Sequence, residues 1–590
     1  MTVESTPVTG APGRRRGWSE LSLGVAVAPW LVFLLTAAVH LGLSVHMRTP
    51  IIHADEYGYL MGAHFLARGG VPTGKPFSPG YSLLIVPFWW LSDSASSVYR
   101  WTLDLNAVLA GFSSVLLLRL ARRLAPSAGA AQWAMAAVVV AAYPATLLYS
   151  DLAESENLLI PGFLLTCLLL VRAWDNPRPR RWLAVAAATG LLYWVHERTV
   201  VVAGALALVA LDSLRPWRRN GPALAATAGG LAVTMTGGGL LTHWVTRPVP
   251  GRELPATGST AGHILAQVTS AGGLAHFGAE LAGQGLYLLI GAGALTVLGI
   301  LALIRRGDRQ DTWLGRPAGP LPLFLVLVLL AEAALAAVYL ATGNRVDVAI
   351  YGRYLEVFTP PVFLVGVLAG MRLAGTGRWW RGVGPALAVG VALAVTSFGV
   401  ALHWGRVLSG PVVTANLLAV ADVVRGSPAR VTVASLAGAG LAAALTVLAG
   451  FRLSAFGGAA VAVAVMIPAS AYGYSYLIRQ TNGRLAGRAL PAEIVAIQHA
   501  DHVSCVSWDS DLVDDWSFYN TRLFAPDVAF DVFNSDRGST LPCPSGLVVA
   551  GRSLSRTAGF GGAKLLLTGP SPASLWVMPG PLARQLAARP

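Results

Sequence analysis

The chain has 590 residues, of which 54% are hydrophobic and only 12% are charged. A typical soluble domain carries about twice that fraction of charged residues, so the composition excludes an ordinary soluble protein. The net charge of +14 does not point to nucleic acid, because the arginines cluster in short loops between apolar runs, as the positive-inside rule describes. We therefore predict a polytopic α-helical protein of the plasma membrane with no nucleic-acid partner. Abundant arginine and alanine with very little lysine is typical of a high-GC genome, such as that of an actinobacterium.

In residues 1–91 the sequence predicts, in this order, a cytoplasmic tail, a membrane anchor, an outer loop and a short apolar helix. Residues 1–20 are polar, rich in proline and glycine, and contain three consecutive arginines, which predicts a disordered cytoplasmic tail. Residues 21–479 hold the apolar runs of the expected transmembrane domain. The first span, Leu21–Val45, has no convincing cleavage site after it and should remain as an anchor. Residues 46–80 follow as an outer loop, and Tyr81–Leu91 is too short to span, which favours an interfacial or re-entrant helix.

The remaining runs alternate between arginine-rich inner loops and mixed outer loops, which gives about thirteen spans, with the N-terminus inside and the C-terminus outside. Two of the spans should form a hairpin with His196–Arg198 as its outer turn. An arginine cluster precedes the first span and another follows the second, and a hairpin puts both clusters on the inner side. Each arm is roughly 20 Å long, shorter than a hydrocarbon core of about 30 Å, so the tip should be recessed in a polar cavity. The expected spans after the first are Leu105–Leu118, Ala130–Tyr149, Leu158–Val171, Trp182–Val195, Thr199–Leu211, Ala223–Val245, Leu286–Ile304, Leu321–Leu340, Val357–Met371, Val383–Leu402, Val431–Gly450 and Phe456–Ile478.

Residues 480–590 change character and predict a small extracytoplasmic α/β domain. Polar residues become more frequent and the apolar runs shrink to strand length. A helix is expected within Asp511–Leu523. Cys505 and Cys543 both lie in this part, where a disulfide is expected if it is outside the cytoplasm. The expected strands are Val503–Trp508, Val528–Phe533, Leu547–Ala550, Lys564–Thr568 and Leu575–Met578.

The charged residues differ between the two expected sides of the membrane. The inner ones are almost all arginine, whereas the outer ones mix acids, bases and histidine. Because ionisable groups at membrane depth are costly and usually functional, this asymmetry is the strongest functional signal in the sequence. The outer set is Asp55, Glu56, His64, Lys75, Asp151, Glu154, Glu156, His196, Glu197, Arg198, Arg353 and Glu356.

The adjacent acids Asp55 and Glu56 are the first candidates for catalysis. They follow the membrane boundary directly, beside Tyr57 and Tyr59. A carboxylate there can take the proton from an acceptor hydroxyl, although a solvated start of a loop explains the pair as well. Glu154 and Glu156 form a second acidic pair, for which capping of the helix that begins near Asn157 is as good an explanation as an active-site role.

The outer cations are candidate phosphate ligands. Lys75 and Arg353 run against the positive-inside trend, and for Arg353, which lies between Tyr351 and Tyr354, an interfacial anchor is the alternative. For Arg198 the sequence leaves two hypotheses open, namely binding of phosphate and neutralisation of Glu197. For His196 it leaves three, namely a ligand, an acid and an ordinary buried histidine. No spacing of histidine and acidic residues indicates a metal site, so a divalent metal is possible but not indicated, and no cofactor is predicted.

Together these motifs resemble the GT-C superfamily of polyprenyl-phosphate-sugar-dependent glycosyltransferases, with protein O-mannosyltransferases and lipid A aminoarabinose transferases as the nearest types. The resemblance covers roughly residues 20–375, including the second acidic loop and the hairpin with Arg198. The residues that carry it are Asp55-Glu56, Tyr59, Ala63, Gly69, Lys75-Pro76 and Pro79-Gly80-Tyr81-Ser82-Leu83-Leu84.

The resemblance implies an inverting transfer from a polyprenyl-phosphate-linked sugar to an envelope glycan, lipid or protein acceptor, in contact with membrane lipid. It makes Asp55 the catalytic base, with Glu56 beside it. The implied residues for the donor phosphate or the substrate are His53, Tyr59, Lys75, Tyr81, Glu154, Glu156, His196, Arg198, Arg353 and Tyr354.

Two other classes of protein remain as alternatives. A transporter or flippase of lipid-linked or envelope precursors would explain the spans, but it needs polar groups at mid-depth and commonly shows internal repeats, which are not visible in this sequence. A non-catalytic envelope-assembly protein is the third class.

Overall fold

The structure is a computed structural model that describes most of the helical part and the C-terminal domain. Three expected spans, Val383–Leu402, Val431–Gly450 and Phe456–Ile478, lie outside the described residues except at single positions, as do His53 and Lys75. The described residues are 18–51, 55–70, 77–246, 269–292, 294–304, 319–341, 352–375, 392, 478–479, 481–482, 488–512, 516–535, 540–557, 559–568 and 573–589.

The first half of the fold is a helical bundle. Among the described residues, five helices are long and apolar enough to cross a membrane, namely α1, α4, α7, α10 and α14, which makes this a multi-pass membrane protein. The helices are α1 (Trp18–Ser44), α2 (Asp55–Arg68), α3 (Gly80–Leu91), α4 (Ala95–Leu124), α5 (Ala130–Ala141), α6 (Pro144–Tyr149), α7 (Glu156–Asp175), α8 (Pro179–Val195), α9 (Val200–Ser213), α10 (Trp217–Val245), α12 (Ala271–Ala292), α13 (Ala294–Ile304), α14 (Leu321–Ala341), α15 (Arg353–Glu356) and α16 (Thr359–Gly375).

Some helices differ from the expected spans for identifiable reasons. α4 begins ten residues before Leu105, because Arg100 is paired with Asp104 at 2.5 Å and donates to the Ser44 carbonyl at 2.6 Å, so its charge is compensated within the helix packing. The run Ala130–Tyr149 is divided into α5 and α6 just before Pro144, which lacks the N–H that a continuous helix needs.

The C-terminal half of the bundle also departs from expectation. The expected span Leu286–Ile304 is instead the end of α12, which begins at Ala271, followed by α13. α13 packs against α16 at two glycines, Gly299 and Gly366, where an added Cβ would meet backbone of the opposite helix. Small residues at such a crossing let two backbones approach closely.

The C-terminal domain is a five-stranded sheet with helices, as the sequence predicts. The strand order is β2-β1-β3-β5-β4, with β1 parallel to β2 and β3, and β5 antiparallel to β3 and β4. The disulfide Cys505–Cys543 is formed. The elements are α21 (Ala489–Asp501), β1 (Cys505–Asp509), α22 (Trp516–Phe524), β2 (Ala529–Phe533), β3 (Leu547–Ala550), β4 (Lys564–Thr568), β5 (Ser574–Val577) and α23 (Pro581–Ala587).

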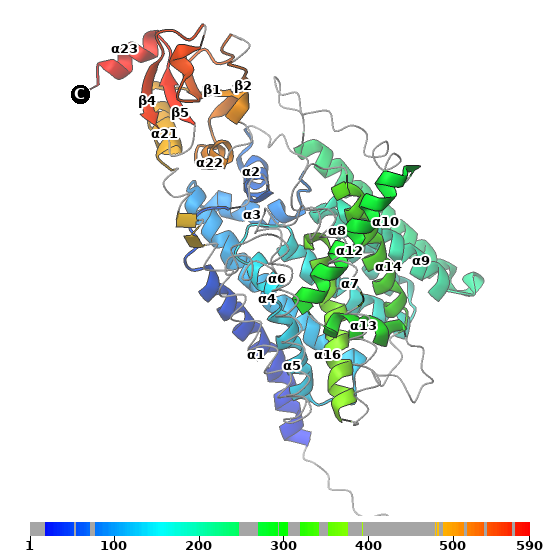
Figure 1. Cartoon of the computed structure of the whole chain (residues 1–590). Helices are drawn as coiled ribbons and strands as arrows, with labels where there is room; N and C mark the ends of the chain where they lie inside the picture. The colour runs from blue at the N-terminus through cyan, green and yellow to red at the C-terminus, as the bar shows by residue number, and fades with distance from the viewer. Residues whose placement is uncertain are drawn as a thin grey trace, which may run out of the picture.

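This domain rests on α2 at one end of the bundle, while α1 and α16 extend toward the other end (Figure 1). The Tyr57 hydroxyl donates to Asn520 Oδ1 at 3.3 Å, and its ring lies against Tyr519. His64 on the same helix lies 3.6 Å from the Asp527 carboxylate. α22 and the turn after it therefore cover the helix that begins at Asp55.

Candidate active site

Asp55 is the first residue of α2, where the helix dipole favours a negative charge. Its Oδ2 accepts a hydrogen bond from Arg353 Nη1 at 2.7 Å, and 29% of its side chain is exposed. The carboxylate is thus fixed by an arginine and still reachable from outside the protein.

Arg353, the first residue of α15, joins three acidic side chains from distant parts of the chain. Besides Asp55, its Nε donates to Glu156 Oε1 at 2.8 Å, and its Nη2 pairs with Glu154 Oε2. The planar guanidinium, with five donors, suits such a multiple contact better than a lysine ammonium. Glu154 and Glu156 are fully buried, so Asp55 is the exposed carboxylate of the three.

A second arginine, Arg198, lies on the other side of Glu156. It occupies the turn between α8 and α9, so the sequence Trp182–Leu211 forms two helices that meet at this turn, as the hairpin interpretation predicts. Arg198 Nη2 lies 3.3 Å from Glu156 Oε1, and Nε lies 3.5 Å from Glu332 Oε1 on α14. Its guanidinium stacks over Tyr354 at 4.8 Å.

These contacts bear on the alternative interpretations of Arg198 and of the second acidic pair. Arg198 pairs with Glu156 and Glu332, and among the described residues it forms no ion pair with Glu197. Glu154 and Glu156 both point to Arg353, so they belong to the cluster instead of acting only as helix caps.

The cluster is rich in negative charge. Four carboxylates, those of Asp55, Glu154, Glu156 and Glu332, meet two guanidinium groups, so full ionisation gives 2 − 4 = −2. Burial raises the pKa of Glu154 well above its usual range, against the opposing effect of Arg353. A proton on Glu154 reduces the excess, and Asp55 remains the accessible carboxylate.

Glu56 has a different position from the one its sequence suggests. Its side chain is fully buried, and its two oxygens accept from the backbone N–H groups of Ile51 at 2.6 Å and Ala153 at 2.8 Å. It therefore joins the segment before Asp55 to the loop that carries Glu154. These contacts favour a positioning role for Glu56, and its catalytic role stays a prediction.

The acidic loop itself is held by Asn157. Its Nδ2 donates to the carbonyls of Tyr149 at 2.8 Å, Leu152 at 2.9 Å and Glu154 at 3.1 Å. This single amide satisfies three carbonyls ahead of α7, so the two glutamates are presented by a closed turn.

Three further predicted residues lie inside the protein. Tyr81 is fully buried and donates to Asn106 Oδ1 at 2.6 Å, and the buried ring of Tyr59 packs edge-on against it. Both tyrosines are buried in this structure, and their assignment to substrate binding stays a prediction. His196 Nδ1 accepts from the backbone N–H of Arg198, and burial together with the Arg198 charge lowers the pKa of His196 to about 3. It is therefore a neutral histidine that caps a turn.

The sequence interpretation missed two participants. Glu332 lies within the apolar run of α14, where a lone acid among uncharged residues is the signal that could have found it. The other is a group in which the Tyr149 and Tyr287 hydroxyls both bond to Glu356. It anchors α15 next to Arg353, and no sequence motif marks it.

Two comparisons with known proteins found similarity to this chain. Residues 84–237 match the family model described as dolichyl-phosphate-mannose-protein mannosyltransferase. No curated protein sequence matches the chain. The structure of ArnT from Cupriavidus metallidurans bound to undecaprenyl phosphate is similar, with 15% identity, a TM-score of 0.55, and coverage of 94% of this chain and 99% of that one. The apo state of the same protein gives 16% identity, a TM-score of 0.52, and coverage of 93% and 98%.

The fold is therefore that of a polytopic membrane protein of the GT-C type. The matched segment, residues 84–237, covers about a quarter of the chain and lies within this fold.

Proposed function

We propose that this chain is a membrane glycosyltransferase that moves a sugar from a polyprenyl-phosphate donor to an acceptor outside the cytoplasm, with Asp55 as general base. The observation that carries the proposal is the exposure of Asp55 at the edge of an otherwise buried carboxylate–arginine cluster. The binding of undecaprenyl phosphate by the structurally similar ArnT supports the choice of donor.

The transfer step follows from this arrangement. The Asp55 carboxylate takes the proton of the acceptor hydroxyl, and the acceptor oxygen forms a bond to the anomeric carbon. The bond between that carbon and the donor phosphate oxygen breaks, its electrons stay on the lipid phosphate, and the configuration inverts. The ion pair with Arg353 orients the Asp55 carboxylate before the step.

The leaving phosphate needs a positive partner. The donors of Arg353 are directed to three carboxylates, which supports a positioning role for it in place of phosphate binding. Arg198 has an Nη1 with no partner among the described residues, so we assign it to the phosphate, together with Lys75, which lies outside the described residues.

We also propose that the cluster and the C-terminal domain face the extracytoplasmic side and that the N-terminus is cytoplasmic. The arginine-rich ends of α4 and α7 lie at the opposite ends of those helices from the cluster, which supports this orientation. The acceptor is an envelope glycan, lipid or protein, and the C-terminal domain on α2 is well placed to help bind it.

The test uses the full-length protein in lipid vesicles with a radiolabelled polyprenyl-phosphate sugar and a membrane extract as the source of acceptor. Asp55→Asn should lower transfer by about 10²–10⁴-fold while donor binding persists. Asp93→Asn is the matched control, because Asp93 is exposed and, within the part of the chain that the structure describes, its ion pair is with Arg68. Full transfer by the Asp55→Asn variant would exclude this base. Movement of labelled lipid across the vesicle without transfer would favour the transporter alternative.

A further inference from the structure

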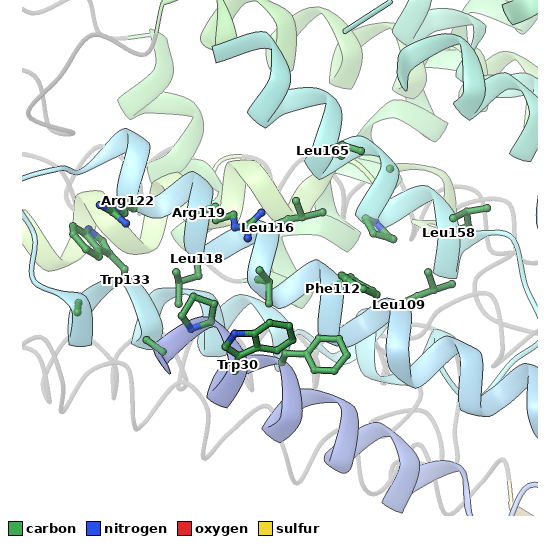
Figure 2. A pocket seen from close by; sticks show the side chains of 17 residues that line it. Trp30, Leu109, Phe112, Leu116, Leu118, Arg119, Arg122, Trp133, Leu158 and Leu165 are labelled. Atoms are coloured by element: carbon green, nitrogen blue, oxygen red, sulfur yellow. The ribbon is translucent and has the colours of Figure 1, made fainter. Parts of the chain in front are cut away.

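A hollow in the bundle extends from the first turn of α7 to the last turns of α4. It has a volume of about 650 Å³ and is walled by α1, α4, α5 and α7. Its lining is almost entirely apolar, and Figure 2 shows Trp30, Phe112 and Leu109 along it. Trp30 is 69% exposed and Phe112 is 53% exposed, so the hollow opens sideways toward the surrounding lipid.

One end of this groove carries two arginines. Arg119 and Arg122 come from the last turns of α4, and the Arg122 guanidinium lies 5.8 Å from the centre of the Trp133 ring (Figure 2). Within the described ranges, neither arginine has an acidic partner. Two guanidinium groups at the end of an apolar groove match a ligand with an anionic head and a hydrocarbon chain.

A second hollow next to this end adds to the positive charge. It has a volume of about 540 Å³ and is lined by four arginines, from α4, α7 and α8. Asp175 pairs with one of them, Arg123, at 3.1 Å. The surplus of positive charge is thus concentrated where α4 and α7 end.

The length of the groove indicates which kind of ligand fits it. Leu109 and Arg122 lie at opposite ends of the groove, roughly 20 Å apart along α4 at 1.5 Å per residue. One leaflet of a bilayer contributes about half of a hydrocarbon core of roughly 30 Å. The groove therefore accommodates an acyl chain of ordinary length in one leaflet.

The arginine-bearing end of the groove is distant from the proposed catalytic cluster. Glu156 begins α7 and Arg172 lies in its last turn, roughly 24 Å away along the helix. The arginines of the groove lie at this far end, so a donor phosphate at Arg198 cannot reach them in the same position.

We propose that this groove is a binding site for an anionic phospholipid of the leaflet opposite the cluster, with its phosphate on Arg119 and Arg122 and an acyl chain along α1 and α4. The inference does not depend on the proposed glycosyl transfer. It predicts that the protein retains phosphatidylglycerol selectively over phosphatidylcholine.

The experiment is native mass spectrometry of the full-length protein in a mild detergent, titrated with phosphatidylglycerol, phosphatidylcholine or a polyprenyl phosphate. The double variant Arg119→Gln/Arg122→Gln should weaken phosphatidylglycerol binding by roughly tenfold or more. Arg218→Gln/Arg219→Gln is the matched control, because these exposed arginines lie at the start of α10, outside the groove.

A second pair of variants tests the apolar part without changing charge. Leu165→Trp fills the groove and should reduce phosphatidylglycerol binding, whereas Leu191→Trp, exposed on α8 outside the groove, should not. Equal retention of both phospholipids, or equal effects of the groove and control variants, would overturn the site. Selective binding of the polyprenyl phosphate in the groove would also overturn the proposal, because the ligand would then be the carrier lipid and not a phospholipid.

Discussion

Arg353 donates from Nη1 to Oδ2 of Asp55 across 2.7 Å, and this ion pair joins two segments that lie 298 residues apart in the chain. The same guanidinium also holds Glu154 and Glu156. One side chain therefore orients the proposed base and ties α2, the acidic loop and α15 together.

Replacing Arg353 with lysine should abolish most transfer and destabilise the fold, because one ammonium group cannot satisfy three carboxylates. Breaking a buried ionic cluster costs about 3–5 kcal/mol, so the melting temperature should fall clearly. The control is Arg68→Lys, whose partner Asp93 is 93% exposed and whose pair contributes at most about 1 kcal/mol. A melting temperature and activity equal to wild type would contradict the central role of Arg353.

The stability of the fold should depend on pH through the titration of Glu356. Burial raises the pKa of Glu356 from 4.5 to about 7. The folded state thus binds this proton more tightly than the unfolded state, and the resulting stabilisation is complete below pH 4.5 and is lost as the pH rises through about 7. Thermal unfolding measured across this range should show stability falling as the pH rises. The Glu356→Gln variant should show a flatter profile, and an unchanged profile would rule out Glu356 as its source.

Glu56 should behave as a positioning residue. Glu56→Ala leaves the buried N–H groups of Ile51 and Ala153 without their acceptor, which should cost roughly 1–3 kcal/mol. Glu56→Gln keeps one acceptor and should retain more stability and more transfer than the alanine variant. The measurement is transfer rate together with chemical unfolding. If the glutamine variant lost turnover as completely as Asp55→Asn while remaining fully stable, Glu56 would have to act in the chemistry itself.

The contact between Tyr57 and Asn520 should couple the C-terminal domain to α2. Removing the hydrogen bond by Tyr57→Phe should cost about 0.5–1.5 kcal/mol, and so should Asn520→Ala. The double variant should cost less than the sum of the two, because each single change removes the same bond. Unfolding of the four proteins gives the coupling free energy. Strict additivity would mean that the two side chains do not interact.

The sequence by itself determined the local features of this protein. The composition and the long apolar runs identified a multi-pass membrane protein, and all five strands and α22 of the C-terminal domain lie where alternation and turn residues predicted them. It also singled out Asp55, Glu154, Glu156, Arg198 and Arg353 as outer charged residues. These features depend on a few neighbouring residues, so hydropathy and periodicity can report them.

Only the tertiary structure decided which of these charges meet. It turned Glu56 inward to backbone donors, buried Tyr59 and Tyr81 in the core, and brought Glu332 to Arg198. An ion pair across hundreds of residues depends on how helices pack and on which charges burial forces to find partners. No local pattern encodes that choice, because the same carboxylate is stable in water as well as beside an arginine.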